Sequence, residues 1–213
     1  MATEIAPNVY EIQLPAAEES YRAHLFDGNV STLFDTGSAD TVDTLIEELE
    51  TLGVVPERVI ITHADFDHIG GFDAIVERYD PETWIPEQST LETTAEPDHR
   101  FGDGDSLNEF VAVHVPGHTD DNYAFVDEER GIAVLGDVLI GADRRGLPRG
   151  YFVMTEAIYS NDLIAAERYL ERLLAFEFDI GLVSHGSSVM EDARDKIEAY
   201  VEFPAKPDWD DRD

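Results

Sequence analysis

The sequence predicts an α/β fold, and three observations support this class. Short segments rich in β-branched residues alternate with segments of helical periodicity along most of the 213 residues. Residues 30–62 have the order strand, helix and strand, which is typical of a parallel crossover. Residues with metal-binding side chains directly follow several predicted strands, and α/β sheets bind ligands at the carboxyl ends of their strands.

The first part of the chain predicts an antiparallel meander and then the crossover. Three strands are expected at Val9–Leu14, Tyr21–Phe26 and Val30–Phe34, separated by Pro15 and by the turn Asp27-Gly28-Asn29. Residues 40–52 carry apolar side chains at helical spacing and end before Gly53. Residues 59–62 then form the next strand.

The remaining elements follow the same rules of periodicity. A helix at 72–78 and a strand at 83–85 are expected, followed by an irregular acidic region that ends at Asp105. Further strands are predicted at 109–116, 123–126, 131–135 and 180–183, and helices at 161–176 and 189–201. Because no repeat or linker divides the chain, we expect one domain over residues 1–203 and an acidic tail at 204–213.

The segment Ile60 to Gly71 concentrates potential metal ligands. His63, Asp65, Asp67 and His68 lie within six positions, after a β-branched run and before two glycines. If the strand continues through this segment, its period of two places the first three side chains on one face, and a turn then brings the second histidine to the same cavity. A helix would separate Asp65 from the others. The alternative is an acidic, solvated loop, because this chain is rich in carboxylates.

Three later motifs place similar residues where a predicted strand passes into a loop. They are Pro116-Gly117-His118-Thr119, Gly136-Asp137 and Ser184-His185-Gly186. A single histidine is more often a packing residue than a ligand, but four histidines at strand ends favour a metal site. His24, His99 and His114 match no motif, so we expect them to be packing residues.

This order of motifs resembles the metallo-β-lactamase superfamily, whose hallmark is a His-x-His-x-Asp-His run followed by separate His, Asp and His ligands. The chain looks most like the small glyoxalase II-type hydrolases. The resemblance implies a four-layer αβ/βα sandwich of two mixed sheets flanked by helices, with a dinuclear metal site. By position, it implies one metal held by His63, Asp65 and His118, a second held by Asp67, His68 and His185, and Asp137 as the bridge. Asp35 would hydrogen-bond a ligand without binding metal itself.

Two departures from the family pattern affect the prediction. Asp65 stands where histidine is usual, and Thr119 is followed by Asp120-Asp121-Asn122 where Pro-Gly-Ser is common. A carboxylate is a harder ligand than imidazole and shifts the preference towards iron or manganese. We therefore expect two divalent metal ions, with zinc as the first choice and iron or manganese as alternatives.

The predicted activity is hydrolysis of a thioester, ester or lactone by a hydroxide held between the two metals. Asp67 would orient this nucleophile or accept its proton. In glyoxalase II a glutathione-binding helical domain normally follows the last histidine, whereas 28 residues (186–213) follow His185 here. A non-haem diiron reductase or dioxygenase on the same scaffold is the alternative. A metal-free binding module would require an incomplete ligand set.

Three arginines close together give a candidate substrate anchor. Arg144, Arg145 and Arg149 lie within six residues, soon after Asp137. Guanidinium groups bind carboxylate or phosphate in a bidentate manner, so these residues could hold an anionic group of a small-molecule substrate. The alternative is a loop that is paired with the acidic surface.

Composition excludes several classes of partner. The 47 acidic and 14 basic residues give a net charge of −33, which opposes binding to nucleic acid or to an anionic membrane. There is no cysteine, no apolar run of membrane-spanning length and no signal-like start. We expect a cytoplasmic protein of a halophile. The sequence leaves the oligomeric state and the physiological substrate open.

We predict that the melting temperature and the activity rise between about 0.1 and 2 M KCl. Salt shortens the Debye length from about 10 Å at 0.1 M to about 3 Å at 1 M and so screens repulsion among the surface carboxylates. Thermal unfolding across this range checks the prediction. A melting temperature that does not change with KCl would contradict the high-salt interpretation.

Overall fold

The computed structural model describes residues 1–16 and 20–203, in two compact units that meet in the sequence at Asp103 and Gly104. Each unit combines one main mixed sheet with helices, which confirms the α/β class with two mixed sheets flanked by helices. The single domain over residues 1–203 stays a prediction. The predicted tail at 204–213 lies outside the described residues.

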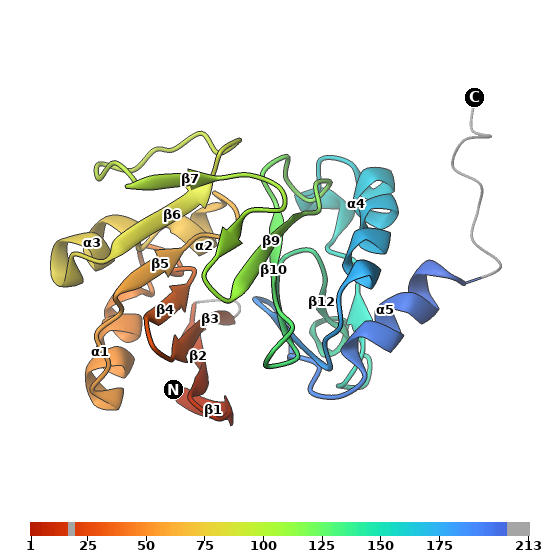
Figure 1. Ribbon diagram of the computed structural model, residues 1–213, viewed down its shortest axis with the longest axis horizontal. Helices are drawn as coiled ribbons and strands as arrows, with labels where there is room; N and C mark the ends of the chain where they lie inside the picture. Colours follow the sequence, from red (N-terminus) through yellow and green to blue (C-terminus); the bar gives the residue numbers. More distant parts are fainter. Residues whose placement is uncertain (17–19, 204–213) are drawn as a thin grey trace. The chain divides into compact units, whose positions relative to one another are not determined.

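The first unit is built on a seven-stranded sheet whose strands follow one another in sequence order. The strands are β1 (Ala2–Ala6), β2 (Val9–Pro15), β3 (Ser20–Asp27), β4 (Ser31–Phe34), β5 (Arg58–Ile60), β6 (Glu82–Pro86) and β7 (His99–Phe101). Strands β1 to β4 are antiparallel and β4 to β7 are parallel, as Figure 1 shows. The predicted meander and the parallel crossover between β4 and β5 are therefore confirmed.

Two helices cover one face of this sheet. In Figure 1, α1 (Val42–Leu52) and α3 (Phe72–Tyr79) lie on the same side of it. Leu45 and Leu49 of α1 and Phe72 of α3 are fully buried in one core cluster with residues of the strands. Burial of each of these side chains stabilises the unit by about 1.5–3 kcal/mol. A third helix, α2 (Phe66–Ile69), is a single turn.

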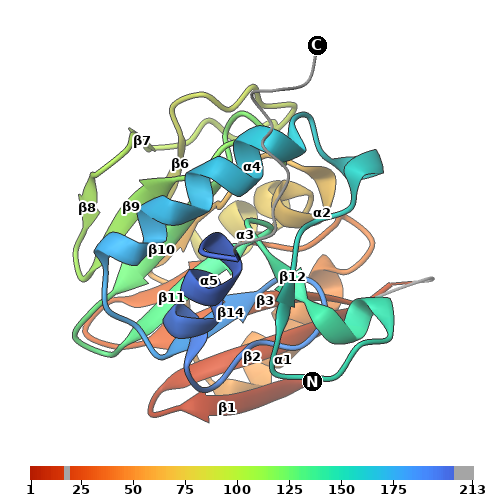
Figure 2. The ribbon, with the colours of Figure 1, turned by 90° about the vertical axis from the view of Figure 1, so that its right-hand side faces the viewer.

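The second unit is built on a five-stranded sheet in the order β14-β11-β10-β9-β8. Its strands are β8 (Ser106–Leu107), β9 (Phe110–His114), β10 (Tyr123–Asp127), β11 (Ile132–Gly136) and β14 (Ile180–Val183), and a separate pair is formed by β12 (Ile140–Gly141) and β13 (Phe152–Val153). Only β11 and β14 pair in parallel among these described strands. Figure 2 shows α4 (Leu163–Tyr169) and α5 (Ala193–Val201) lying over the same face of the sheet.

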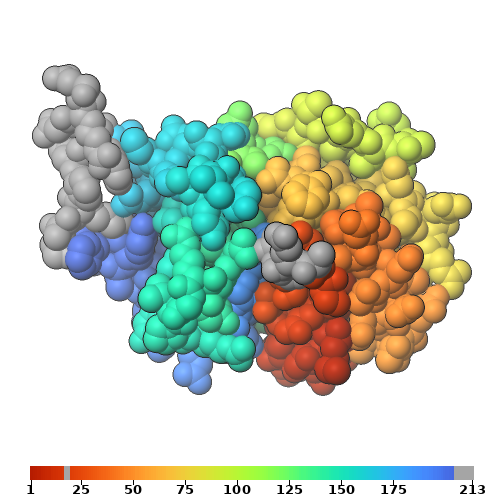
Figure 3. Space-filling model, turned by 180° about the vertical axis from the view of Figure 1, so that it is seen from behind, coloured from red at the N-terminus to blue at the C-terminus, as the bar shows by residue number. Residues whose placement is uncertain are grey.

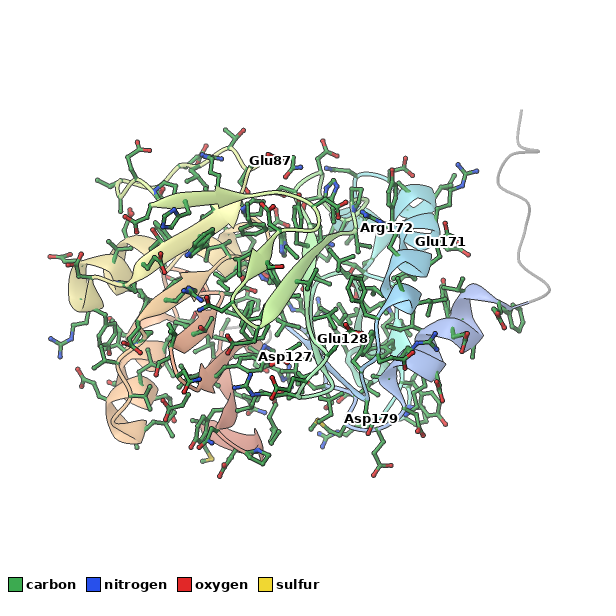
Figure 4. The ribbon with its side chains drawn as sticks, in the orientation of Figure 1. Glu87, Asp127, Glu128, Glu171, Arg172 and Asp179 are labelled. Atoms are coloured by element: carbon green, nitrogen blue, oxygen red, sulfur yellow. The ribbon has the colours of Figure 1, made fainter. Side chains whose placement is uncertain are left out.

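Polar contacts fix the helical segments of this unit to its strands. Arg172 donates a hydrogen bond of 2.7 Å to the backbone carbonyl of His114 at the end of β9 (Figure 4). Glu128 and Asp179, labelled in the same figure, accept hydrogen bonds from the backbone N–H groups of Glu177 and Asp192. Some of the abundant carboxylates therefore hold loops in place as well as carrying charge.

Three secondary-structure predictions were wrong in detail. The helix expected at 161–176 is α4 followed by the 3₁₀ helix η3 (Leu170–Ala175), in which Leu170 and Leu173 are buried. The region expected to be irregular contains the short strand β7. The last helix begins at residue 193 instead of 189, because Val189 pairs with Gly181 in a β-bridge. In the described part of the chain, no helix is long and apolar enough to cross a membrane.

Candidate metal centre

The carboxylate of Asp35, at the end of β4, organises the ligand loop of the first unit. Asp35 is buried and adopts a left-handed backbone conformation with φ of 60°. Its Oδ1 accepts a hydrogen bond of 2.8 Å from the backbone N–H of Thr62, and its Oδ2 accepts from the Thr62 hydroxyl at 2.9 Å. The same Oδ2 lies 2.8 Å from Nδ1 of His68.

The contact between Asp35 and His68 fixes the tautomer and the orientation of the His68 ring. A carboxylate only accepts, so Nδ1 carries the hydrogen and Nε2 carries the ring's lone pair. Metal-binding histidines are commonly held by such an outer carboxylate, which fixes both tautomer and ring orientation. Asp35 thus contacts a potential ligand, and its role as the outer partner of a bound metal stays a prediction.

The ligand segment itself does not have the predicted backbone. Strand β5 ends at Ile60, five residues earlier than Asp65, and α2 begins at Phe66. The carbonyl of Asp65 accepts from the backbone N–H groups of His68 and Ile69, which closes the single helical turn. The strand-end alternation proposed from the sequence was therefore wrong. The sequence argument assumed that Gly70 and Gly71 would prevent a helix in this segment. Instead, the two glycines follow the single turn and end it.

The four potential ligands of this unit nevertheless lie close together. Nε2 of His63 is 3.7 Å from Oδ2 of Asp65, and Nε2 of His68 is 3.9 Å from Oδ2 of Asp67. The two imidazole rings have centroids 3.9 Å apart. Both histidines are buried, whereas the side chain of Asp65 is 42% exposed. The motif thus forms a compact cluster with one open edge at Asp65.

Close backbone packing holds this turn against the loop that follows Asp35. The carbonyl of His68 accepts hydrogen bonds from both the backbone N–H and the hydroxyl of Thr36. A Cβ atom added to Gly70 would lie 2.8 Å from the backbone nitrogen of Ala39 and 2.3 Å from the carbonyl oxygen of Phe66. Only glycine permits this approach. Gly70, two residues after His68, is therefore required for the close packing of this turn.

The second unit carries its own cluster, centred on Asp137. Oδ2 of Asp137 lies 3.2 Å from Nε2 of His185 and 3.6 Å from Nε2 of His118. All three side chains are buried. They come from loops that follow β9, β11 and β14, so the prediction that each lies at a strand end is confirmed within this unit.

Backbone contacts position these three loops. A Cβ atom added to Gly117 would lie 2.2 Å from the backbone nitrogen of Ala166, so α4 packs directly on the residue before His118. Gly117 also has φ of 135°, which L side chains rarely adopt. The backbone carbonyl of His185 accepts from the N–H of Gly141, and that of Asp137 accepts from the Thr155 hydroxyl.

The donor atoms in both clusters suit a divalent transition metal. Neutral imidazole and carboxylate are ligands for zinc, iron and manganese. Two ligand atoms, each about 2.0–2.2 Å from a tetrahedral metal, are separated by about 3.3–3.6 Å. The nitrogen-to-oxygen separations of 3.2–3.9 Å lie within about 0.3 Å of this range, and most exceed the length of a hydrogen bond. The residues present therefore fit metal ions.

The three arginines after Asp137 lie in and beside the 3₁₀ helix η1 (Ala142–Arg145). The guanidinium groups of Arg144 and Arg145 are 3.6 and 3.7 Å from Glu156, and Arg145 also donates to the carbonyl of Met154. Arg149 is 3.3 Å from Asp143, and its side chain is 82% exposed. All three are thus near carboxylates, and Arg149 is the most open of them.

Asp143 links this arginine loop to the residues after His185. Its carboxylate accepts from the backbone N–H and the hydroxyl of Ser187 at 2.8 and 2.7 Å. Burial alone raises the pKa of Asp143, but these hydrogen bonds and the charge of Arg149 hold the pKa below its ordinary value. The carboxylate is therefore ionised at neutral pH and keeps the two loops joined.

The histidines that match no motif have packing roles, as predicted. His99 stacks on Trp84 with centroids 4.1 Å apart and contacts Glu82. His114 stacks on Tyr123, and its Nε2 lies 2.8 Å from the carbonyl of Asp120. His24 is buried within the seven-stranded sheet, 3.8 Å from Glu11.

Sequence reasoning missed the contribution of Thr62. Its hydroxyl lies 3.1 Å from Nδ1 of His63 and donates to Asp35, so one side chain connects the Asp35 carboxylate to a potential ligand. The signal was a threonine directly before the motif in an otherwise apolar strand. It could have been found by asking which polar group would meet the buried Asp35 carboxylate.

The sequence over residues 22–201 matches the family model described as Metallo-beta-lactamase superfamily. The chain belongs to the metallo-β-lactamase superfamily. Solved structures of metallo-β-lactamase fold proteins are similar to it. Metallo-beta-lactamase family protein TTHA1429 from Thermus thermophilus gives a TM-score of 0.70 at 19% identity, covering 94% of this chain and 80% of that one. TTHA1623 in a di-iron-bound form gives 0.67 at 22% identity, covering 92% and 98%. These likenesses confirm the metallo-β-lactamase fold.

Curated relatives in this superfamily are named as hydroxyacylglutathione hydrolases. The protein of Chromohalobacter salexigens is 34% identical over 137 residues, which cover 60% of this chain and 51% of that protein. The protein of Xylella fastidiosa strain M12 is 32% identical over 133 residues, covering 59% and 48%. The chain spans about half the length of both. Hydroxyacylglutathione hydrolase GloC of Haemophilus influenzae is 25% identical over 205 residues, covering 84% and 91%.

We predict that Asp35→Asn lowers the affinity for Zn(II) about 10- to 100-fold without unfolding the protein. Asparagine also adopts the left-handed conformation, so the backbone is preserved. However, its single acceptor oxygen cannot replace both carboxylate oxygens, so its amide NH₂ group faces a donor, either the Thr62 backbone N–H or the Thr62 hydroxyl and the Nδ1–H of His68. Competition with a chelator measures the affinity, and circular dichroism checks the fold.

Asp80→Asn is the matched control, because Asp80 also has a left-handed backbone, with φ of 51°, but caps α3 instead of contacting a ligand. This variant should bind Zn(II) like the parent. Equal affinities for the parent and Asp35→Asn would show that the carboxylate does not prepare His68 for metal.

Proposed function

We propose that the protein is a metal-dependent hydrolase that cleaves thioesters, and also esters or lactones, with two divalent metal ions. The observation that carries this proposal is the pair of imidazole–carboxylate clusters, one in each unit, with His68 oriented by Asp35. The relatives named as hydroxyacylglutathione hydrolases support thioester chemistry.

The residues that would hold the metals are those that the family motifs indicate. Within the first unit these are His63, Asp65, Asp67 and His68, and within the second they are His118, Asp137 and His185. Their assignment to individual ions, with Asp137 as the bridge, stays a prediction from the sequence. When bound, two such cations would lower the pKa of water and polarise an acyl carbonyl.

The protein's own residues would prepare and support this chemistry. Asp35 holds His68 in the tautomer that offers Nε2, and Thr62 ties this carboxylate to the turn that carries His63. Asp67 is partly buried beside His68 and would orient the attacking water or accept its proton. Thioesters, esters and lactones are favoured over amides because thiolate and alkoxide leave without the protonation that an amine requires.

The arginine loop would anchor an anionic part of the small-molecule substrate. Arg149 is the best candidate, because its side chain is largely exposed while Arg144 and Arg145 lie near Glu156. A guanidinium in this position could bind a carboxylate or phosphate in a bidentate manner. The acidic composition supports a cytoplasmic protein that works at high salt and does not bind nucleic acid or anionic membranes.

The alternative function is that of a non-haem diiron redox enzyme, and one observation favours it. Asp65 replaces an imidazole with a carboxylate in the ligand turn, 3.7 Å from His63, and carboxylate is a better ligand for iron or manganese than for zinc. Metal analysis of the protein purified without added metal separates the two functions. Zinc supports hydrolysis, whereas iron with a visible absorption band supports redox chemistry.

A panel of thioesters, esters, lactones and phosphoesters assayed at high KCl tests the hydrolase proposal. We predict thioester hydrolysis that is almost completely lost, together with metal, in His185→Ala and Asp137→Asn, because no neighbouring group replaces either ligand. His99→Ala, which removes a packing histidine, should retain both. Full metal content and turnover in His185→Ala would contradict the proposed ligand set.

We also predict that Asp65→His increases the preference for zinc over iron and manganese, because imidazole is the softer ligand. Metal content after expression, and competition among the three ions, measure this preference. Asp40→His is the control, since it replaces an exposed acid outside the ligand turn. If Asp65→His binds the same metals in the same proportions as the parent, Asp65 is a surface acid and not a ligand.

A further inference from the structure

A pocket of about 480 Å³ opens in the first unit, beside the metal-ligand turn. Its apolar lining includes Ala64, Phe66 and Ile69 from this turn and Leu91 from the loop between β6 and β7. Figure 3 shows this face, where the light-orange segment that contains α2 meets the yellow-green loop that precedes β7. Its volume lies within the range of small-molecule sites, about 300–1,000 Å³.

The far wall of the pocket is fixed in place. The carboxylate of Asp73 accepts hydrogen bonds of 2.9–3.0 Å from the backbone N–H groups of Thr94 and Ala95. Arg100 donates to the carbonyl of Ser89 at 3.0 Å and also contacts those of Pro86 and Glu87. The loop that carries Leu91 is therefore held at both ends, and the pocket is formed before any ligand enters.

The charge of Asp73 is part of this wall at neutral pH. Burial alone raises the pKa of Asp73, but the backbone N–H groups of Ala95 and Thr94 hold the pKa below its ordinary value. The contribution of this carboxylate to stability is therefore present at neutral pH and is lost only as the pH falls through the lowered pKa.

Phe66 is the unusual member of the lining. Ala64, Ile69 and Leu91 pack on or within the core cluster, whereas the ring of Phe66 is 70% exposed. Phe66 stands between Asp65 and Asp67, so its Cα lies about 3.8 Å from that of each candidate ligand. An aromatic ring kept in solvent at this point costs hydrophobic free energy that a bound apolar group would recover.

The charges around the pocket restrict what can enter it. Of its nine described lining residues, the charged ones are Asp73 and Glu92, and both are acidic. A carboxylated or phosphorylated group would meet repulsion there, whereas a neutral apolar group would meet Phe66, Ile69 and Leu91. The pocket therefore differs in chemistry from the arginine loop, which suits an anion.

We propose that this pocket binds the acyl side of the substrate and selects neutral, apolar acyl chains over short or anionic ones, with Phe66 and Leu91 as the residues that determine specificity. This inference rests on the proposed hydrolase function and names its substrate class. Ala64 and Phe66 flank Asp65, so an acyl chain in the pocket would place its carbonyl beside the ligand turn.

A thioester series on one common thiol tests this proposal with the metal-loaded full chain at high KCl. We expect kcat/KM to rise about threefold or more for each methylene from acetyl to hexanoyl, as burial of a CH₂ group allows. Succinyl thioester, which is anionic, should react at least about tenfold more slowly than butanoyl thioester. Glu92→Gln should reduce this discrimination against succinyl.

Two variants test the named residues. Phe66→Ala and Leu91→Ala should flatten the dependence of kcat/KM on chain length, and Phe66→Leu should retain most of the dependence. Val55→Ala, which removes an exposed apolar side chain elsewhere in the same unit, should behave like the parent. Thermal unfolding checks that the partly buried Leu91 variant is folded.

Binding of hexanamide, observed through backbone amide NMR shifts, tests the pocket without requiring turnover. Shifts confined to residues 64–73 and 90–93, weakened in Phe66→Ala, support the proposal even if every thioester proves inert, an outcome that would overturn the hydrolase function alone. Thioester hydrolysis with no dependence on chain length, or an unchanged dependence in both alanine variants, overturns the pocket assignment and leaves the hydrolase function standing. Hexanamide shifts outside these residues also overturn the assignment.

Discussion

The contact between the Asp35 carboxylate and the ligand turn is the constraint on which the rest of the first unit's site depends. One buried side chain satisfies the Thr62 backbone, the Thr62 hydroxyl and the Nδ1–H of His68. A carboxylate in such a buried position is stable only when it is fully hydrogen-bonded. The demand for those partners fixes where the chain must turn after β5, and therefore where its potential metal ligands lie.

The two units build their clusters in different ways. In the first, four potential ligands come from one segment of six residues, and backbone contacts at Gly70 and Thr36 hold the turn within it. In the second, His118, Asp137 and His185 come from three loops, each at the end of a different strand. The register of the sheet and the close packing of Gly117 on α4 bring those loops together. Local geometry thus decides the first cluster and tertiary packing decides the second.

This difference explains what could be predicted from the sequence. Hydrophobic periodicity was sufficient for the long strands and for α1 and α3, and the contiguous motif indicated its potential ligands directly. The order of motifs identified the dispersed residues, but only by resemblance, because no local pattern links His118 to Asp137. The backbone of the ligand turn was predicted incorrectly, since one helical turn depends on hydrogen bonds at Asp65 that periodicity does not encode. The pocket wall at Leu91 could not be predicted, because Asp73 and Arg100 fix it across long sequence separations.

The single turn of α2 places two kinds of residue on opposite sides. Asp67 and His68 project from one side, while Phe66, Ile69 and Gly70 occupy the other, as the helical period of 3.6 requires. Substitution of Phe66 on the second side can therefore change the shape of the pocket without replacing a potential ligand. The turn thus keeps the side chains that could hold a metal apart from those that shape the pocket, so that the pocket can change independently of the potential ligands.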